Sequence, residues 1–357
     1  MGLVTQTGTD DLKERVEKAL AQFLVDQRSV LTNIDPALAV VADTIERFVL
    51  RGGKRLRPAF AYWGYRGAGG EDSDEVVAAV AALELIQASA LIHDDVMDAS
   101  DTRRGEPSVH RRFELIHTSS GWTGDAKAFG ASAAVLLGDF CLAWSDELLR
   151  RSGIDVDALM RARPVFDLMR TEVIAGQYLD VHAQATADSS LDRASTVARY
   201  KSAKYTVERP LLLGAALANA QPALQAAYSD YGLPLGEAFQ LRDDILGVFG
   251  DPSQTGKPAG DDLREGKRTY LIAAAFAAAD ERTAQVLREG LGNPNLDAAG
   301  VTVLREIIVR TGALARTEAR IADLTKASLR ALDSVELANG AGEMLTALAH
   351  AATERAL

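Results

Sequence analysis

Apolar residues recur at helical spacing along almost the whole chain, and stretches that alternate like a β-strand are scarce. Alanine and leucine dominate these periodic segments, and the 357 residues include only 10 prolines. The pattern predicts helices over residues 11–31, 36–50, 57–66, 74–98, 125–151, 155–185, 192–219, 223–249, 269–280, 283–291, 297–332 and 340–356. Breaks or kinks are expected at three prolines and one glycine: Pro164, Pro210, Pro234 and Gly312.

Stretches rich in glycine and proline predict the loops, at residues 67–72, 103–107, 119–124 and 251–266. No linker or change of composition divides the chain, so we expect one domain over residues 1–357. Many long helices without a β region predict an all-α fold, a single large helical bundle. The first ten residues, 1–10, are expected to be disordered.

The composition limits the partners and the compartment. A net charge of −11 makes nucleic acid and anionic membrane surfaces unnatural partners. The single cysteine, Cys141, cannot form an internal disulfide, and in the apolar run 133–144 it is expected to be an inert core thiol. The start lacks a signal peptide, and runs such as residues 271–279 are too short to span a bilayer. These features predict a cytoplasmic protein with no membrane span.

Two acidic clusters stand at the polar ends of apolar helical runs, DDVMD at residues 94–98 and a pair of aspartates at residues 243–244. On a helix, Asp94 and Asp98 share a face about 6 Å apart along the axis. Like charges at this spacing repel by about 0.2–0.5 kcal/mol, so a cation is expected to offset the repulsion. Oxygen ligands suit Mg²⁺, which takes one or two carboxylates plus phosphate oxygens. Candidate metal ligands are Asp94, Asp95, Asp98, Asp243 and Asp244.

A solvated helix end is the alternative interpretation of such a cluster. It is weaker here because the upstream run, residues 76–86, is nearly all apolar and predicts a helix buried on most sides. Buried carboxylates need partners, and a second cluster stands in the same context.

Basic segments accompany both acidic clusters. RGGKRLRP at residues 51–58 combines flexible glycines with lysine and arginine, and DTRRG at residues 101–105 follows the first cluster. Lys201 stands in a helical segment, and Lys257 and Lys267 lie in and after the loop that follows the second cluster. Each alone is more often a solvated surface charge. Together, in an acidic protein, they suggest two phosphate subsites, one reached through metal and one directly by Arg and Lys.

The order and joint occurrence of these motifs resemble the trans-isoprenyl diphosphate synthases, the group of farnesyl, geranylgeranyl and polyprenyl diphosphate synthases. The resemblance is strong from about residue 48 to 270. It rests on GGKRLRP at 52–58, DDVMD with RRG at 94–105, GQYLD at 176–180 and FQLRDD at 239–244.

The resemblance implies a helical bundle around a deep central cavity, usually as a homodimer. It also implies head-to-tail condensation of isopentenyl diphosphate with an allylic diphosphate, with three Mg²⁺ ions per active site. The catalytic group that it implies around the allylic diphosphate is Asp94, Asp98, Arg103, Lys201, Gln240, Asp243 and Lys257. The substrate-binding residues that it implies are Lys54, Arg57, Gln87, Arg104, Gln177, Asp180, Ser202 and Lys267.

The chemistry that the resemblance implies agrees with these residue types. Breaking the allylic C–O bond leaves pyrophosphate, whose developing charge Mg²⁺, Lys and Arg stabilise. The allylic cation then attacks the double bond of isopentenyl diphosphate, and a proton passes to the departing pyrophosphate. This accounts for a chain in which no His or Glu stands out as a general base.

Two positions depart from the family pattern. Gly247 stands where many members carry a third aspartate, and Asp251 or the pair Asp261 and Asp262 is expected to take over part of its role. The C-terminus, residues 352–357, holds one arginine where some members have a basic cluster. We expect activity to survive, because the missing aspartate is the outermost of its motif.

The product tail is expected to run along the helix that ends in the first acidic cluster. Ser89 and Ala90 are small, whereas members that stop at fifteen carbons tend to have bulky aromatics there. Ile86 and Leu83 lie deeper and are expected to form the floor. Because one isoprene unit is about as long as one helical turn, roughly 5 Å, we predict a C20 product, geranylgeranyl diphosphate. Farnesyl (C15) and longer (C25+) products are the alternatives, and close helix packing is another reason for two small residues.

Two other function classes share parts of this pattern. A class I terpene cyclase or a head-to-head condensing enzyme has an aspartate-rich helix, but a cyclase does not need a second diphosphate subsite at Lys54 and Arg57. A non-catalytic regulatory subunit typically loses one acidic cluster, whereas this chain keeps both, and Gly247 is the one feature in its favour.

Overall fold

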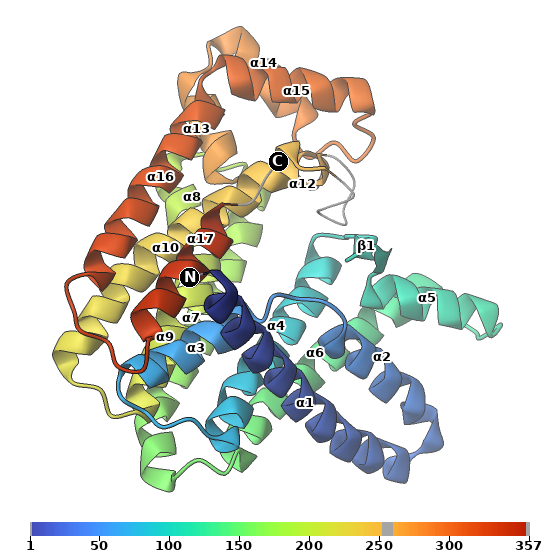
Figure 1. The fold of residues 1–357 in the computed structure, drawn as a ribbon. Helices are drawn as coiled ribbons and strands as arrows, with labels where there is room; N and C mark the ends of the chain where they lie inside the picture. Colours follow the sequence, from blue (N-terminus) through green and yellow to red (C-terminus); the bar gives the residue numbers. More distant parts are fainter. Residues whose placement is uncertain (1, 252–259, 355–357) are drawn as a thin grey trace. The chain divides into compact units, whose positions relative to one another are not determined.

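The computed structural model describes residues 2–251 and 260–354, without the side chains of residues 2–10 (Figure 1). Helices make up 79% of the chain, which confirms the all-α class. The backbone of residues 2–10 belongs to the first helix, Gly2–Ile34, and the disorder expected for residues 1–10 stays a prediction.

The chain divides into two compact units. The first comprises residues 1–163 and 213–219, and the second comprises residues 164–212 and 220–357. Helices α7 (Val156–Ala185) and α9 (Arg209–Leu217) each continue from one unit into the other. The single domain over residues 1–357 stays a prediction.

The first unit is built on α4 (Asp74–Met97), which packs against α1, α3 and α6. Ser73 caps α4 by accepting a hydrogen bond from the Val76 N–H, and Asp74 and Glu75 place negative charge in its first turn. Its apolar middle is buried, as the sequence predicts. The other elements are α1 (Gly2–Ile34), the 3₁₀ turn η1 (Pro36–Leu38), α2 (Ala39–Leu50), α3 (Leu56–Gly67), β1 (Thr102–Arg103), β2 (Glu106–Pro107), α5 (Val109–Ser119) and α6 (Ala126–Arg151).

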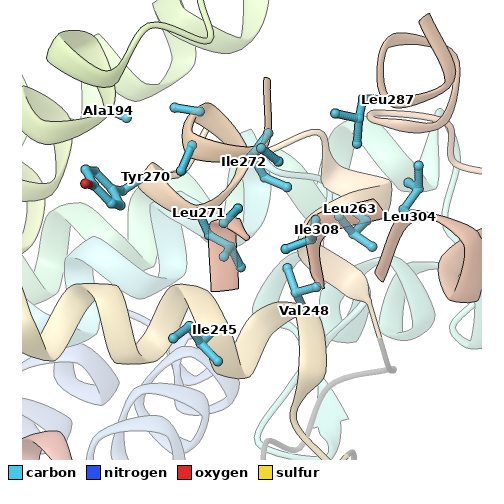
Figure 2. Close-up of a cluster of buried hydrophobic side chains, with 14 of the residues drawn as sticks. Ala194, Ile245, Val248, Leu263, Tyr270, Leu271, Ile272, Leu287, Leu304 and Ile308 are labelled. Atoms are coloured by element: carbon cyan, nitrogen blue, oxygen red, sulfur yellow. The ribbon is translucent and has the colours of Figure 1, made fainter. Parts of the chain in front are cut away.

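The second unit is built on α10 (Pro222–Phe249), which packs against the π-helix η2 (Ala198–Glu208), α16 and α17. A buried apolar cluster joins α10 to the C-terminal helices, and it includes Ile245, Val248 and Leu263 (Figure 2). The other elements are α8 (Leu191–Val197), α12 (Asp261–Glu265), α13 (Tyr270–Ala278), α14 (Glu281–Gly290), α15 (Ala298–Arg310), α16 (Ala313–Leu332) and α17 (Ala341–Thr353).

The segment predicted as one helix over residues 192–219 consists of α8, η2 and α9 in direct succession. The eleven residues of η2 form a π-helix, which is long for this type of helix because most π-helices span a single turn. Helical periodicity alone could not separate it from an α-helix. The single helix expected over residues 297–332 is interrupted at Gly312, as predicted, where φ is +77°.

Other local predictions fared less well. Helix α7 runs on through Pro164, and α10 runs on through Pro234, so neither proline breaks its helix, and a kink at these two positions stays a prediction. The loop expected at residues 103–107 belongs to a short antiparallel ribbon, in which Thr102 pairs with Pro107 and Arg103 with Glu106. Helices α5 and α12 were not predicted; α12 has only five residues and lies in the segment 251–266 that was expected to be a loop.

Two helices in the described part of the chain, α4 and α6, are long and apolar enough to cross a membrane by length and composition. The prediction that every apolar run is too short is therefore wrong for these two. In α4, 72% of the apolar window is buried inside the protein, and in α6 it is 44%. Because buried core helices of soluble proteins pass the same test, these two helices are weak evidence for a membrane span.

Candidate active site

The first acidic cluster lies at the C-terminal end of α4. Asp94 and Asp95 stand in its last turn, and the N–H of the C-cap residue Asp98 donates to the Asp94 carbonyl at 2.8 Å. Asp95 is fully buried, whereas Asp94 and Asp98 are half-buried. The helix therefore presents Asp94 and Asp98 nearer to solvent than the carboxylate between them.

Arg103 lies against this cluster. Its Nε donates to Oδ1 of Asp95 at 2.9 Å, its Nη2 contacts the same oxygen, and Nη2 is 3.6 Å from Oδ2 of Asp94. The ribbon explains this position, because its turn passes through Arg104 (φ +54°) and Gly105 (φ +76°) directly after Arg103. The contact between Asp95 and Arg103 indicates that Asp95 orients the guanidinium.

Arg104 ties the ribbon to the basic segment at residues 51–58. Its Nη1 donates to the Phe48 carbonyl at 3.3 Å and to the Arg51 carbonyl. Gly52 and Gly53 adopt positive φ of +71° and +92°, and a Cβ on Gly52 would lie 3.5 Å from Cδ of Arg104. The two glycines thus allow a conformation that other residues rarely adopt.

The basic segment is anchored by Arg55, a residue that the sequence analysis did not single out. Arg55 is buried, and its guanidinium pairs with Glu84 in the apolar middle of α4. On either side of this anchor, Lys54 is exposed and Arg57 is half-buried. The signal was present in the sequence, because one Glu in an otherwise apolar buried run requires a cationic partner.

The second acidic cluster lies in the last turns of α10. Asp244 is buried and accepts a hydrogen bond from Nε2 of Gln240 at 2.7 Å, whereas Asp243 is half-buried. Burial raises the pKa of Asp244 to about 8. The hydrogen bond from Gln240 lowers this pKa, whereas the negative charges of Asp262, Asp243 and Asp180 raise it further. A nearby cation would reverse this effect, because it favours the ionised carboxylate.

The π-helix supplies Lys201, whose Nζ donates to Oδ2 of the buried Asp180 on α7 at 2.6 Å. Close packing permits this contact, because a Cβ on Gly176 would lie 2.7 Å from Cα of Lys201. A Cβ on Gly236 of α10 would likewise lie 2.6 Å from Cα of Ala203. Glycines on both flanking helices therefore let their backbones approach η2.

Three further predicted residues belong to the same unit as the second cluster. Gln177 of α7 and Ser202 of η2 are half-buried, in the same unit as the second cluster. Lys267 follows α12, where its Nζ lies 3.4 Å from Oδ1 of Asp262 and 2.7 Å from Oε2 of Glu265. Lys257 lies outside the described residues.

The residues predicted to set product length all lie on α4. Leu83, Ile86 and Ser89 are buried, and Ala90 is half-buried. Gln87, predicted to contact isopentenyl diphosphate, is half-buried on the same helix. Their roles stay predictions.

Comparison with known proteins decides the family. Residues 39–308 match the model of the polyprenyl synthetase family. The chain belongs to this family. It is 31% identical over 328 residues to a short chain isoprenyl diphosphate synthase of Methanothermobacter thermautotrophicus, covering 92% of this chain and 94% of that protein. It is 34% identical over 235 residues to a geranylgeranyl diphosphate synthase of Mycobacterium tuberculosis, covering 66% and 61%.

A solved structure of a polyprenyl synthetase agrees over nearly the whole chain. The geranylgeranyl pyrophosphate synthase of Corynebacterium glutamicum, solved with isoprenyl diphosphate and magnesium, is 44% identical with a TM-score of 0.94, covering 97% of this chain and 99% of that one. The resemblance seen in the sequence is therefore confirmed. The protein is a prenyltransferase of the isoprenyl diphosphate synthase class.

Polyprenyl synthetases use a divalent metal, and the carboxylate oxygens at the two acidic clusters are of the ligand type that Mg²⁺ prefers. Among residues 2–251 and 260–354, no three His, Cys, Asp or Glu side chains form a cluster that alone could hold a metal ion. Mg²⁺ keeps several waters and is usually bound by one or two carboxylates plus the phosphates of a substrate.

Proposed function

We propose that this protein condenses isopentenyl diphosphate head to tail with an allylic diphosphate, in a Mg²⁺-dependent reaction that yields geranylgeranyl diphosphate. The observation that carries the proposal is the position of Arg103, a forked cation held by Asp95 beside the half-buried Asp94. Carboxylates for metal and a guanidinium for phosphate thus share one helix end. The names of several relatives, which are geranylgeranyl diphosphate synthases, support the C20 product.

The acidic clusters and their cations bind the allylic diphosphate. Asp94, Asp98 and Asp243 hold Mg²⁺, with three ions per active site. When bound, Mg²⁺ offsets the charge that develops on the departing pyrophosphate. Three cationic side chains contact the same group: Arg103, Lys201 and Lys257.

Isopentenyl diphosphate binds to the basic segment beside α4. Lys54 is exposed and Arg57 half-buried on either side of the buried Arg55, so both can reach an anion. Arg104 and Gln87 complete this subsite. A second diphosphate subsite distinguishes a condensing enzyme from a terpene cyclase.

Uncharged polar groups and apolar side chains surround the reacting carbons. Ser202, Gln177 and Gln240 line the site, and the backbone of η2 with Gln240 faces the allylic cation. A water-poor environment protects the cation from quenching. The proton leaves to the departing pyrophosphate, so no side chain acts as a general base.

The product length follows from α4. Ser89 and Ala90 let the prenyl tail pass, and Ile86 and Leu83 close its path after twenty carbons. Because the tail is apolar and extended, the residues of one helical turn decide one isoprene unit, about 5 Å.

The enzyme acts in the cytoplasm as a homodimer. Large apolar side chains are exposed on one face of α7, where Ile174 and Tyr178 stand four residues apart and Val181 three further on. Exposed apolar patches of this kind mark protein–protein contacts.

The release of pyrophosphate tests the proposed reaction. The protein is mixed with isopentenyl diphosphate and farnesyl diphosphate, and pyrophosphate is measured with Mg²⁺ and after EDTA treatment. We expect release only with Mg²⁺ and only with both substrates. Asp94→Ala or Asp243→Ala should reduce it about 100-fold or more with an unchanged circular dichroism spectrum, whereas the exposed Asp323→Ala should not. Release without isopentenyl diphosphate would indicate a cyclase, and equal release in EDTA would contradict the metal assignment.

A further inference from the structure

Gly247 stands on the acidic face of α10. It is four residues after Asp243, so the two positions share one side of the helix, one turn apart. A side chain at position 247 would extend the row of carboxylates toward the end of the helix. Gly247 carries none.

The carboxylate of Asp262 occupies that volume. A Cβ built on Gly247 would overlap Oδ2 and Cγ of Asp262 and would lie 3.1 Å from Oδ1. The position is therefore closed to other residues while Asp262 keeps its conformation. At the same place on the helix face, a carboxylate is present, but it comes from α12.

Packing holds α12 against α10 in this register. Leu263 and Val248, the neighbours of the two residues, are fully buried in one apolar cluster (Figure 2). Backbone hydrogen bonds fix the position of α12 from its other side, because the Gly292 N–H donates to the Leu263 carbonyl at 2.8 Å and the Lys267 N–H to the Asp262 carbonyl at 3.1 Å. The buried packing of Leu263 thus fixes where the backbone of Asp262 lies, and Lys267 contacts its carboxylate.

We propose that Asp262 supplies the third carboxylate of the second acidic cluster, in place of a side chain at position 247. This inference rests on the proposed function, because it assigns Asp262 to the Mg²⁺ and diphosphate that Asp243 serves. It selects Asp262 over Asp251 and Asp261, the other two carboxylates considered from the sequence. Lys267, 3.4 Å from Asp262, orients the carboxylate.

Metal-dependent binding of inorganic pyrophosphate tests this role without turnover. At a fixed pyrophosphate concentration, Mg²⁺ is titrated and the rise in Tm gives the half-saturating Mg²⁺ concentration. Asp262→Asn should raise this concentration about tenfold or more. The same substitution one residue away, Asp261→Asn, should change it by less than about twofold.

The overlap between a Cβ at position 247 and the Asp262 carboxylate gives a second test, in which no charge is altered. Gly247→Ala should push the Asp262 carboxylate aside and raise the half-saturating Mg²⁺ concentration by a similar factor. It should add nothing in the Asp262→Asn background, because the carboxylate is already lost. Gly342→Ala is the matched control, since a Cβ on that helical glycine meets nothing within 4 Å.

The outcomes separate this inference from the proposed function. Normal Mg²⁺ dependence in Asp262→Asn, with a large loss in Asp243→Asn, would overturn the inference and leave the proposed function standing. Normal dependence in both variants would overturn both. If Asp262→Asn does not fold, the double variant Gly247→Asp/Asp262→Ala moves the carboxylate from α12 to α10. A half-saturating Mg²⁺ concentration like that of the wild type supports the inference. A large rise in that concentration overturns it.

Discussion

Arg55 and Glu84 form a buried ion pair, with Nη1 of the arginine 2.7 Å from Oε2 of the glutamate. The side chains are only 3% and 6% exposed, so water screens the pair little. Arg55 also donates to the Val49 carbonyl at 2.8 Å, in the last turn of α2. One residue of the basic segment thereby joins α2 to the helix that carries the first acidic cluster.

Removing Glu84 should destabilise the protein. Glu84→Ala removes the buried counterion of Arg55 and leaves only the partly exposed Glu17, whose Oε1 lies 3.3 Å from Nε of Arg55. Breaking a buried pair typically costs about 3–5 kcal/mol in the free energy of unfolding, and we expect a loss near the lower end of this range because Glu17 remains. Urea unfolding followed by circular dichroism measures this. Glu281→Ala, at an exposed ion pair with Arg288, is the control and should change the free energy of unfolding very little. Equal effects of the two substitutions would show that burial of the Arg55 pair has no energetic importance.

Arg57→Ala should weaken binding of isopentenyl diphosphate. A lost hydrogen bond to a charged group costs about 1.5–3 kcal/mol, which corresponds to roughly a tenfold or greater rise in KM for this substrate. The KM for the allylic diphosphate should change far less. Steady-state kinetics with each substrate varied in turn separates the two, and the exposed Arg330→Ala serves as control. An unchanged KM for isopentenyl diphosphate would place its subsite elsewhere.

Ser89→Phe should shorten the product. Ser89 is buried on α4, and a phenyl ring there would block the path proposed for the prenyl tail. Chromatography of the dephosphorylated products should show a shift from C20 to C15. Ser89→Ala should keep C20, because it adds no bulk. An unaltered chain length in a folded Ser89→Phe protein would remove Ser89 from the wall of the tail path.

The thiol of Cys141 should be unreactive in the folded protein. Cys141 is fully buried on α6, and burial raises its pKa to about 12. Since the thiolate is the reactive form and a raised pKa leaves the thiol protonated, little thiolate exists at pH 8. A thiol reagent such as DTNB should therefore react at pH 8 only after denaturant is added. Rapid reaction in native buffer would contradict the buried position.

The sequence predicted most of the helices because their apolar periodicity is strong, and α4 shows this most clearly. Prolines were poorer guides, since α7 and α10 continue through Pro164 and Pro234. The π-helix η2 escaped prediction, because its residues have no periodicity that distinguishes it from an α-helix.

The candidate site was predicted by residue type rather than by contact. Asp95 was assigned to metal with Asp94 and Asp98, but the structure adds that Asp95 is buried and bonded to Arg103. A side chain's partner depends on which elements pack together, and here the ribbon, which was expected to be a loop, brings Arg103 to α4. Spacing along the chain could not reveal the closure of position 247 by Asp262, because α12 was not predicted.

The identity of the reaction product tests the central claim most directly. The purified protein is incubated with Mg²⁺, radiolabelled isopentenyl diphosphate and, separately, dimethylallyl, geranyl and farnesyl diphosphates, and the dephosphorylated products are sized. We predict a dominant C20 alcohol that forms only when Mg²⁺ is present. No product from any of the three starters would contradict the assignment of this chain as a condensing enzyme.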